Sequence, residues 1–126
     1  MVEQMTEQTN EQQLSEILKA VSDITRRSLL TSVVQEGPIR VTDLANQYDI
    51  SLNAVSKHIK VLESAGLVTR KTVGRVHLIE ANLGPVTEID NWFEQLRSIW
   101  DLRLSHLEKI LLEENKEGNK NERLNS

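Results

Sequence analysis

Cysteine is absent from the 126-residue sequence, which excludes disulfides, thiolate metal sites and a cysteine nucleophile. The sequence also has no apolar run long enough to span a bilayer. Its start, MVEQMTEQTNEQQ, lacks the basic and apolar regions of a signal peptide. We therefore expect a cytoplasmic protein that has no membrane partner.

The usual marks of an active site are missing as well. No serine is set in a nucleophile turn, no glycine-rich loop could cradle a phosphate, and the carboxylates are scattered over helix surfaces. The sequence therefore predicts neither an enzyme nor a bound cofactor.

Positive charge is concentrated in one stretch of a chain whose length is typical of a single domain. The formal net charge is −4. Residues 51–77, however, hold five Lys and Arg residues against the single acid Glu63, a local charge of +4 that leaves −8 on the rest. This distribution indicates where an anionic partner such as nucleic acid would bind.

The chain is predicted to begin with a disordered arm and an amphipathic helix. Residues 1–10 are polar and without periodicity, which favours disorder. A first helix is then indicated by apolar residues at the i, i+3, i+4, i+7 spacing, namely Leu14, Ile17, Leu18 and Val21.

A second helix is predicted from Ile24 to about Gln35. Asp23 is a good residue to cap its start, and Gly37-Pro38 cannot easily continue it. Residues 39–41 then form a candidate extended segment.

A helix-turn-helix is predicted over about 41–65. Thr42 is expected to cap a short third helix, residues 49–51 to form a tight turn, and Ser51 to cap a fourth helix that ends at Gly66. In such a layout the first helix crosses the DNA backbone and the second enters the major groove. The segment 67–80 then favours a β-hairpin around Val73-Gly74, which would form a wing.

The fourth helix has a polar face opposite its apolar one. Asn can pair with adenine, Lys can reach guanine, and Ser can contact a base edge or a phosphate, whereas basic residues of a wing suit phosphates or the minor groove. The predicted DNA-binding residues are Ser51, Asn53, Ser56, Lys57, Lys60, Arg70, Lys71 and Arg75. The alternative for each is ordinary solvated surface. His58 is interpreted as a packed, hydrogen-bonded core residue, and His77 as an exposed one.

A last helix is predicted over about 86–112, followed by a polar tail at 113–126. Its apolar stripe is wider than the core of a small domain would cover, which indicates packing on a second subunit. The residues of this helix that are predicted to lie at the interface are Phe93, Leu96, Trp100, Leu104 and Leu107. Trp92, Phe93 and Trp100 could instead line a ligand pocket.

The sequence from about Leu14 to Leu112 resembles the ArsR-type winged helix-turn-helix repressors of bacteria. Three blocks carry the resemblance: SDITRR at 22–27, AVSKHIKVLE with AGLV at 54–68, and Gly74-Arg75 in the wing. The terminal block WFEQLRSIWDLRLSHLEKI is similar to a subgroup with two tryptophans, and Ile24 stands where the family usually has proline. The elements predicted above make a mainly α fold of five helices with a small β-hairpin. The resemblance implies a homodimeric repressor that binds operator DNA and pairs its first and last helices across the two-fold axis, which adds Leu14 and Leu18 of the first helix to the predicted interface.

Metal sensing is not part of what the resemblance implies here. Many members of the family hold metal through cysteines on the third helix, and the matching stretch 41–46 has none. The other family site uses acids and histidines on the last helix, but Asp90 precedes Asn91 and Trp92, and His106 precedes Lys109 by three residues. We expect a member without a metal, whose small-molecule or protein effector, if it has one, the sequence does not identify.

A winged helix can also bind protein instead of DNA, and the acidic overall charge is compatible with a protein-interaction module. The local basic charge of residues 51–77 favours DNA.

Overall fold

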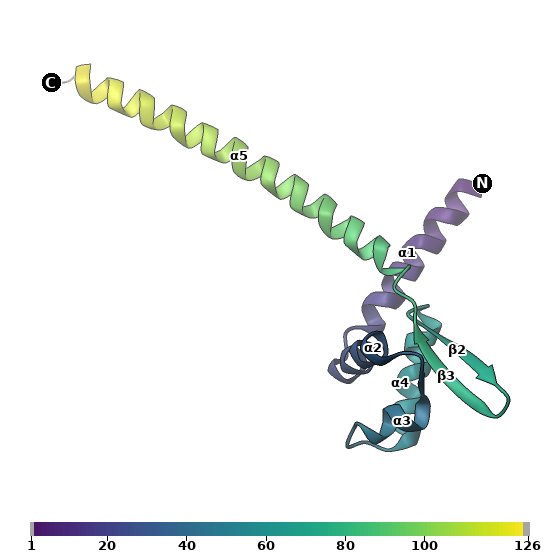
Figure 1. The fold of residues 1–126 in the computed structure, drawn as a ribbon. Coiled ribbons are helices and arrows are strands. Elements are labelled where there is room, and N and C mark those ends of the chain that lie inside the picture. The colour runs from purple at the N-terminus through teal and green to yellow at the C-terminus, as the bar shows by residue number, and fades with distance from the viewer. Residues whose placement is uncertain (1, 125–126) are drawn as a thin grey trace. The chain divides into compact units, whose positions relative to one another are not determined.

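The computed structural model describes residues 2–124, and the side chains of residues 10–118. The chain divides into two units, one up to Ile89 and one from Asp90 onward, and each is described by itself (Figure 1). The elements in chain order are α1 (Val2–Ala20), α2 (Ile24–Glu36), β1 (Ile39–Arg40), α3 (Val41–Asn46), α4 (Leu52–Ser64), β2 (Val68–Val73), β3 (Val76–Ala81) and α5 (Val86–Leu124).

The core of the first unit is built around α4. This helix contacts α1, α2, α3 and β2, and its side chains Val55, Ile59 and Leu62 are fully buried. Every other element of the unit contributes to the same apolar cluster, through Ile17, Ala20, Leu29, Val33, Ile39, Leu44, Ala45, Ala65, Leu67, Val68 and Ile79. The core therefore holds α4 rigidly, with one side left for solvent.

Local signals in the sequence set both ends of α4. At its start the Ser51 hydroxyl accepts a hydrogen bond from the backbone N–H of Ala54 (3.1 Å). At its end Gly66 adopts φ +80°, and the N–H groups of Gly66 and Leu67 donate to the carbonyls of Glu63 and Leu62. This is a Schellman ending, which requires a left-handed residue and so favours glycine.

The sheet has three antiparallel strands in the order β1-β3-β2. The predicted hairpin is confirmed, with Gly74 and Arg75 as its two-residue loop and φ +63° at Gly74. The candidate extended segment forms β1, which pairs with β3 through Ile39 and Arg40. The predicted fold class is therefore confirmed, and the hairpin is enlarged to a small sheet.

Two predictions about helix ends are wrong. Thr42 does not cap α3, because the helix begins two residues earlier than expected, at Val41, and its N-cap position is Arg40, whose side chain makes no capping bond. α1 begins at Val2, where a disordered arm was expected. Glu and Gln are strong helix formers, and the lack of apolar periodicity argued only against a buried face. Residue 1 lies outside the described residues.

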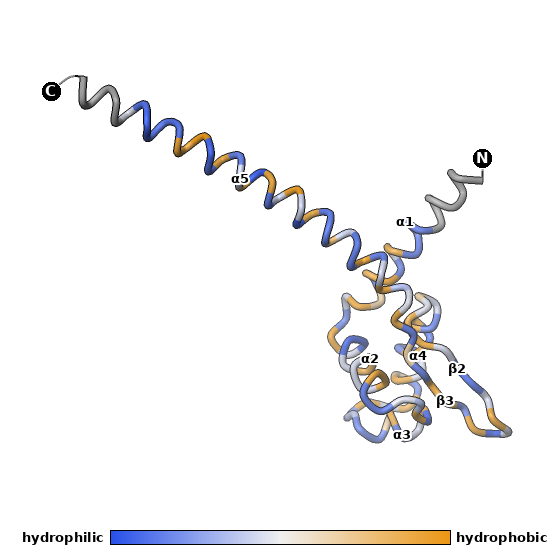
Figure 2. The backbone as a smooth tube through the Cα atoms, turned by 45° about the horizontal axis from the view of Figure 1, so that its top comes forward, coloured by the Kyte–Doolittle hydropathy of each residue, from blue (hydrophilic) through white to orange (hydrophobic). Residues whose placement is uncertain are grey.

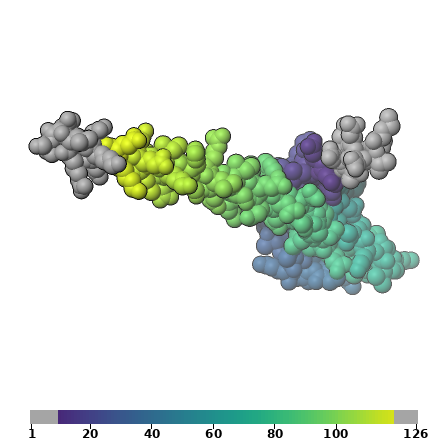
Figure 3. All heavy atoms as spheres, turned by 90° about the horizontal axis from the view of Figure 1, so that it is seen from above, coloured from purple at the N-terminus to yellow at the C-terminus, as the bar shows by residue number. Residues whose placement is uncertain are grey.

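α5 continues beyond 112 to Leu124, through the segment predicted to be a polar tail, and residues 125–126 lie outside the described residues. In the second unit, apolar and polar positions alternate in short runs along this helix (Figure 2), and a space-filling view shows it as a continuous rod of side chains (Figure 3). Its large apolar side chains are exposed, among them Trp100 at 64%. Among the described residues, no helix is long and apolar enough to cross a membrane.

Candidate nucleic-acid interface

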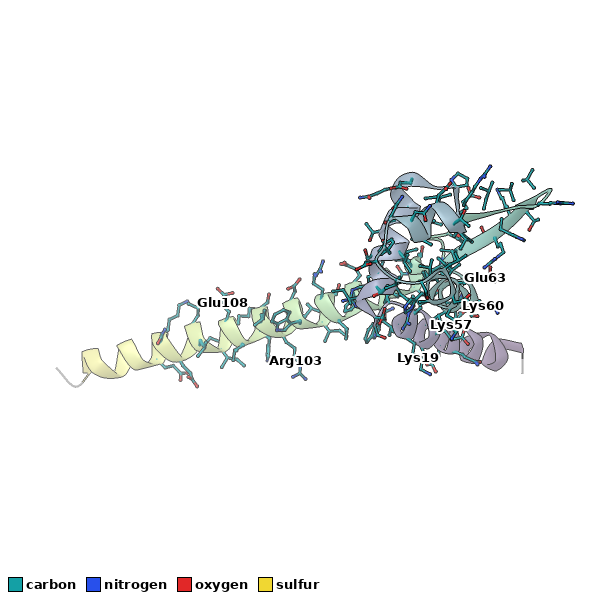
Figure 4. The ribbon with its side chains drawn as sticks, turned by 90° about the horizontal axis from the view of Figure 1, so that it is seen from below. Lys19, Lys57, Lys60, Glu63, Arg103 and Glu108 are labelled. Atoms are coloured by element: carbon teal, nitrogen blue, oxygen red, sulfur yellow. The ribbon has the colours of Figure 1, made fainter. Side chains whose placement is uncertain are left out.

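Three sides of α4 have different surroundings. One side is the buried face described above. Asn53, Lys57 and Lys60 are exposed on the opposite side, where Figure 4 shows both lysines. The third side faces the wing: Glu63 there contacts Arg70 of β2. At 100° per residue Leu52 and Ser56 share this third side with Glu63. The polar residues predicted to read bases are therefore divided between an outward ridge and a wing-facing edge.

The wing also has two different faces, because side chains alternate along a strand. Val68, Arg70 and Thr72 share one face with Ile79 and His77, and the buried Val68 and Ile79 show that this face is turned toward the core. Lys71 lies on the other face. Among the wing residues predicted to bind DNA, Arg70 and Lys71 are thus on opposite sides of the sheet.

A groove of about 300 Å³ lies between the start of α3, the wing-facing edge of α4 and the wing. We call it the wing-side groove. Its polar lining residues are Arg40, Thr42, Ser56, Arg70, Arg75 and His77. No carboxylate lines it among the residues that the structure describes. The groove is therefore a concave surface of positive charge, suited to an anion.

Two of the basic wing residues have acidic partners in this structure. Arg70 Nε lies 3.4 Å from Glu63 Oε2, and Lys71 Nζ lies 2.8 Å from Glu80 Oε2. The hydrogen bond to Glu80, with the charge of that carboxylate, raises the pKa of Lys71 above its usual value. By contrast, Arg40 and Arg75 form no ion pair within the described part of the chain.

The position of the wing relative to α4 is fixed by Asn82, which follows β3. Its backbone N–H donates to the Leu67 carbonyl (2.8 Å), and its side-chain amide donates to the Gly66 carbonyl (3.1 Å). These bonds join the end of the hairpin to the end of α4. Asn82 therefore anchors the base of the wing at the C-terminal end of α4.

The predicted core histidine is half-buried instead of fully buried. His58 Nδ1 lies 3.4 Å from Nη1 of Arg26 on α2. The same guanidinium donates to the Ala20 and Lys19 carbonyls at the end of α1. Arg26 therefore connects the end of α1 with α4. Asp23 caps α2 as predicted: it accepts a hydrogen bond from the Arg26 backbone N–H, which lowers the pKa of its carboxyl.

Two polar residues of the groove, Arg40 and Thr42, were not predicted to bind DNA, and a third, His77, was set aside. Both lie before or at the start of α3, outside the fourth helix and the wing from which the DNA contacts were predicted. His77 was interpreted as merely exposed, yet it faces the groove beside Arg70 and Arg75. Side chains alternate along a strand, so Arg70 and Thr72 lie on the same face as the apolar Val68. His77 pairs with Thr72 and therefore lies on that face as well.

Comparison with known proteins shows the class to which this site belongs. A family model described as a helix-turn-helix domain matches residues 21–71. A solved structure of an ArsR family transcriptional regulator is 32% identical, with a TM-score of 0.66 over 72% of this chain and 93% of the other. The chain belongs to the ArsR family of transcriptional regulators. This confirms the resemblance found in the sequence.

Two curated Bacillus subtilis proteins are also similar to this ArsR-family chain. An uncharacterized HTH-type transcriptional regulator, YuzN, is 34% identical over 85 residues, which are 62% of this chain and 92% of the relative. The transcriptional repressor SdpR is 27% identical over 79 residues, 63% of this chain and 87% of the relative.

Among the described residues of this family member, no group of three or more His, Asp or Glu side chains gathers in a way that could hold a metal ion. The absence of metal sensing stays a prediction.

The predicted dimer residues lie at the surface of their own units. Leu18 on α1 is partly exposed and Leu14 is half-buried. The α5 members of the set are all exposed: Phe93, Leu96, Trp100, Leu104 and Leu107. All seven are available to a partner.

Proposed function

We propose that this ArsR-family regulator is a cytoplasmic homodimeric repressor that binds an imperfect inverted repeat in operator DNA. The two copies of α4 would enter successive major grooves about one helical turn apart, because a two-fold dimer matches two half-sites spaced by roughly 10 base pairs. The observation that carries the proposal is that the polar outer side of α4 lies beside a basic wing, and that both pack on the same apolar core.

The outward ridge of α4 supplies the chemistry for reading bases. Asn53 can pair with adenine through its amide, and Lys57 and Lys60 can donate to guanine. Ser51 and Ser56 flank the ridge, and a serine hydroxyl can contact a base edge or a phosphate. Because α4 is packed on its opposite side by Val55, Ile59 and Leu62, the backbone that carries these groups does not have to be ordered on binding.

The wing supplies the backbone contacts. Arg75 at the tip of the hairpin and Arg70 in the wing-side groove are the main candidates for phosphates. Lys71 is part of the predicted set, but its outward face and its bond to Glu80 make its expected contribution smaller than that of Arg75.

The dimer is supported by the exposed apolar side chains of α5. Contiguous apolar surface of this extent is rare on a soluble monomer, and a second copy would cover it by a self-complementary interface. The proposed interface comprises Leu14, Leu18, Phe93, Leu96, Trp100, Leu104 and Leu107. The direction of control, repression, is supported by the similarity to the repressor SdpR. A small molecule or a protein that loosens this interface would act as an effector.

A mobility-shift experiment with DNA from upstream of the protein's own gene tests the proposal. Specific binding that survives an excess of shuffled competitor DNA is the expected result. If the dimer forms but binds upstream DNA no better than shuffled DNA, the DNA proposal fails. That result would favour the alternative of a winged-helix protein-interaction module.

A further inference from the structure

The wing-side groove extends the basic surface beyond the two segments from which the DNA interface was predicted. One wall is Arg70 and Arg75 of the hairpin, and the other is Arg40 and Thr42 at the start of α3. These two walls are about thirty residues apart in sequence, and β1 brings them together because it pairs with β3 through Arg40 and Leu78.

The positively charged side chains of the groove differ in whether they have an acidic partner. Arg40 and Arg75 are exposed and form no ion pair with the side chains of residues 10–118. Arg70 is held by Glu63 through a single contact of 3.4 Å, and both side chains remain about one-third exposed. A single exposed contact of this length is a weak interaction that a better acceptor can replace.

We propose that the wing-side groove binds a phosphodiester of the operator backbone, with Arg40, Thr42 and Arg75 as ligands, and that Arg70 exchanges Glu63 for phosphate when DNA binds. The inference rests on the proposed DNA-binding function. A phosphodiester fits because the described lining of the groove is cationic and hydroxylic, with no carboxylate. It also fits because the groove adjoins the side of α4 that carries Ser56.

The exchange gives Glu63 a role that opposes affinity. In free protein it neutralises Arg70. In the complex it would lie near the phosphate that Arg70 has joined, and like charges repel. Removing the charge of Glu63 should therefore strengthen DNA binding. If the Glu63–Arg70 pair served only to hold the wing in place, removing that charge would not raise the affinity for DNA.

The experiment measures operator affinity against salt concentration for Arg40→Ala, Arg40→Lys and Glu63→Gln. Each lost phosphate contact lowers the slope of log affinity against log salt by about 0.9. In the proposed homodimer Arg40→Ala removes one contact in each subunit, so the slope should fall by about 1.8. Between 50 and 200 mM salt the affinity of the variant should therefore fall by a factor about 12 times smaller than that of wild type. The loss of affinity itself should be similar for specific and non-specific DNA. Arg40→Lys should keep the wild-type slope, and Glu63→Gln should raise affinity about two- to fivefold.

Lys116→Ala on α5 is the matched control, because it removes one exposed positive charge outside the groove. Circular dichroism melting checks that each variant is folded. A folded Arg40→Ala with wild-type affinity and slope would overturn the groove as a phosphate site while leaving the proposed function intact. Weaker binding by folded Glu63→Gln would overturn the exchange. Absence of binding by wild type would remove the proposed function, and this inference with it.

Discussion

The guanidinium of Arg26 lies 3.4 Å from Nδ1 of His58, and its remaining nitrogens donate to the carbonyls of Ala20 (2.7 Å) and Lys19 (3.2 Å). One side chain thus caps the end of α1 and contacts the helix proposed to read DNA. Since α1 also carries two of the proposed dimer residues, Arg26 lies between the dimer contacts and the DNA contacts.

Replacing Arg26 by alanine should destabilise the first unit and weaken DNA binding together. Three hydrogen bonds of a half-buried charged group are lost, and a change of roughly 1–3 kcal/mol in the free energy of unfolding follows. Urea denaturation and operator titration measure the two effects.

Arg27→Ala is the control for Arg26→Ala, because the Arg27 side chain makes only one bond among the described residues, to the Val21 carbonyl (2.7 Å). Equal loss of affinity in both variants would contradict the special position of Arg26.

Two glycine substitutions should change stability in opposite directions. Gly66→Ala places a Cβ on a residue with φ +80° and should lower the free energy of unfolding by about 1–2 kcal/mol. Gly118→Ala lies in α5, where an added Cβ meets nothing within 4 Å, and should raise helix stability by up to about 1 kcal/mol. Chemical denaturation measures both, and a stabilising Gly66→Ala would refute the Schellman ending of α4.

The Asp23 cap should make stability depend on pH in acid. Its pKa is lowered in the folded state by the hydrogen bond from Arg26 N–H, so its contribution is fully present above the unfolded-state value and is lost as pH falls through the folded-state value. The difference in unfolding free energy between wild type and Asp23→Asn should be constant at neutral pH. It should shrink as pH falls below the ordinary value of 3.8. A difference that stays constant down to pH 2 would argue against the charge of this cap.

Trp100→Glu should break the proposed dimer. The indole is 64% exposed in its own unit, so a charge there is tolerated in a monomer but would be buried without a partner in a two-fold interface. Sedimentation should therefore show a shift to the monomer mass. Val73→Glu at the wing, where valine is 65% exposed, is the control and should leave the mass unchanged. A Trp100→Glu protein as dimeric as wild type would move the interface elsewhere.

The parts of this protein that short-range rules govern were predictable from sequence. Asp23, Ser51 and Gly66 act on the nearest turn of their helices, and each does what its residue type favours. The prediction for Thr42 failed because β1 pairs with β3 and fixes Arg40 as the last extended residue, so α3 begins before the threonine.

The wing-side groove depends on pairing between distant segments, and this explains why Arg40 was missed. Its sequence neighbours carry no polar periodicity, and only the pairing of β1 with β3 brings it to the groove that Arg70 and Arg75 also line. The opposite orientations of Arg70 and Lys71 follow from strand alternation, but charge alone made the two residues equivalent. The exposed apolar stripe of α5 was predictable from the spacing of its residues. The surface that covers this stripe was not, because it belongs to a second molecule.

The most direct test of the proposed interface is a salt titration of operator affinity for Lys57→Ala and Arg75→Ala, with Lys71→Ala as the matched charge control. We expect Lys57→Ala and Arg75→Ala each to weaken binding and to reduce the salt slope by about one for each subunit of the dimer, and Lys71→Ala to change both less. Wild-type affinity and slope in both Lys57→Ala and Arg75→Ala would contradict the proposed interface.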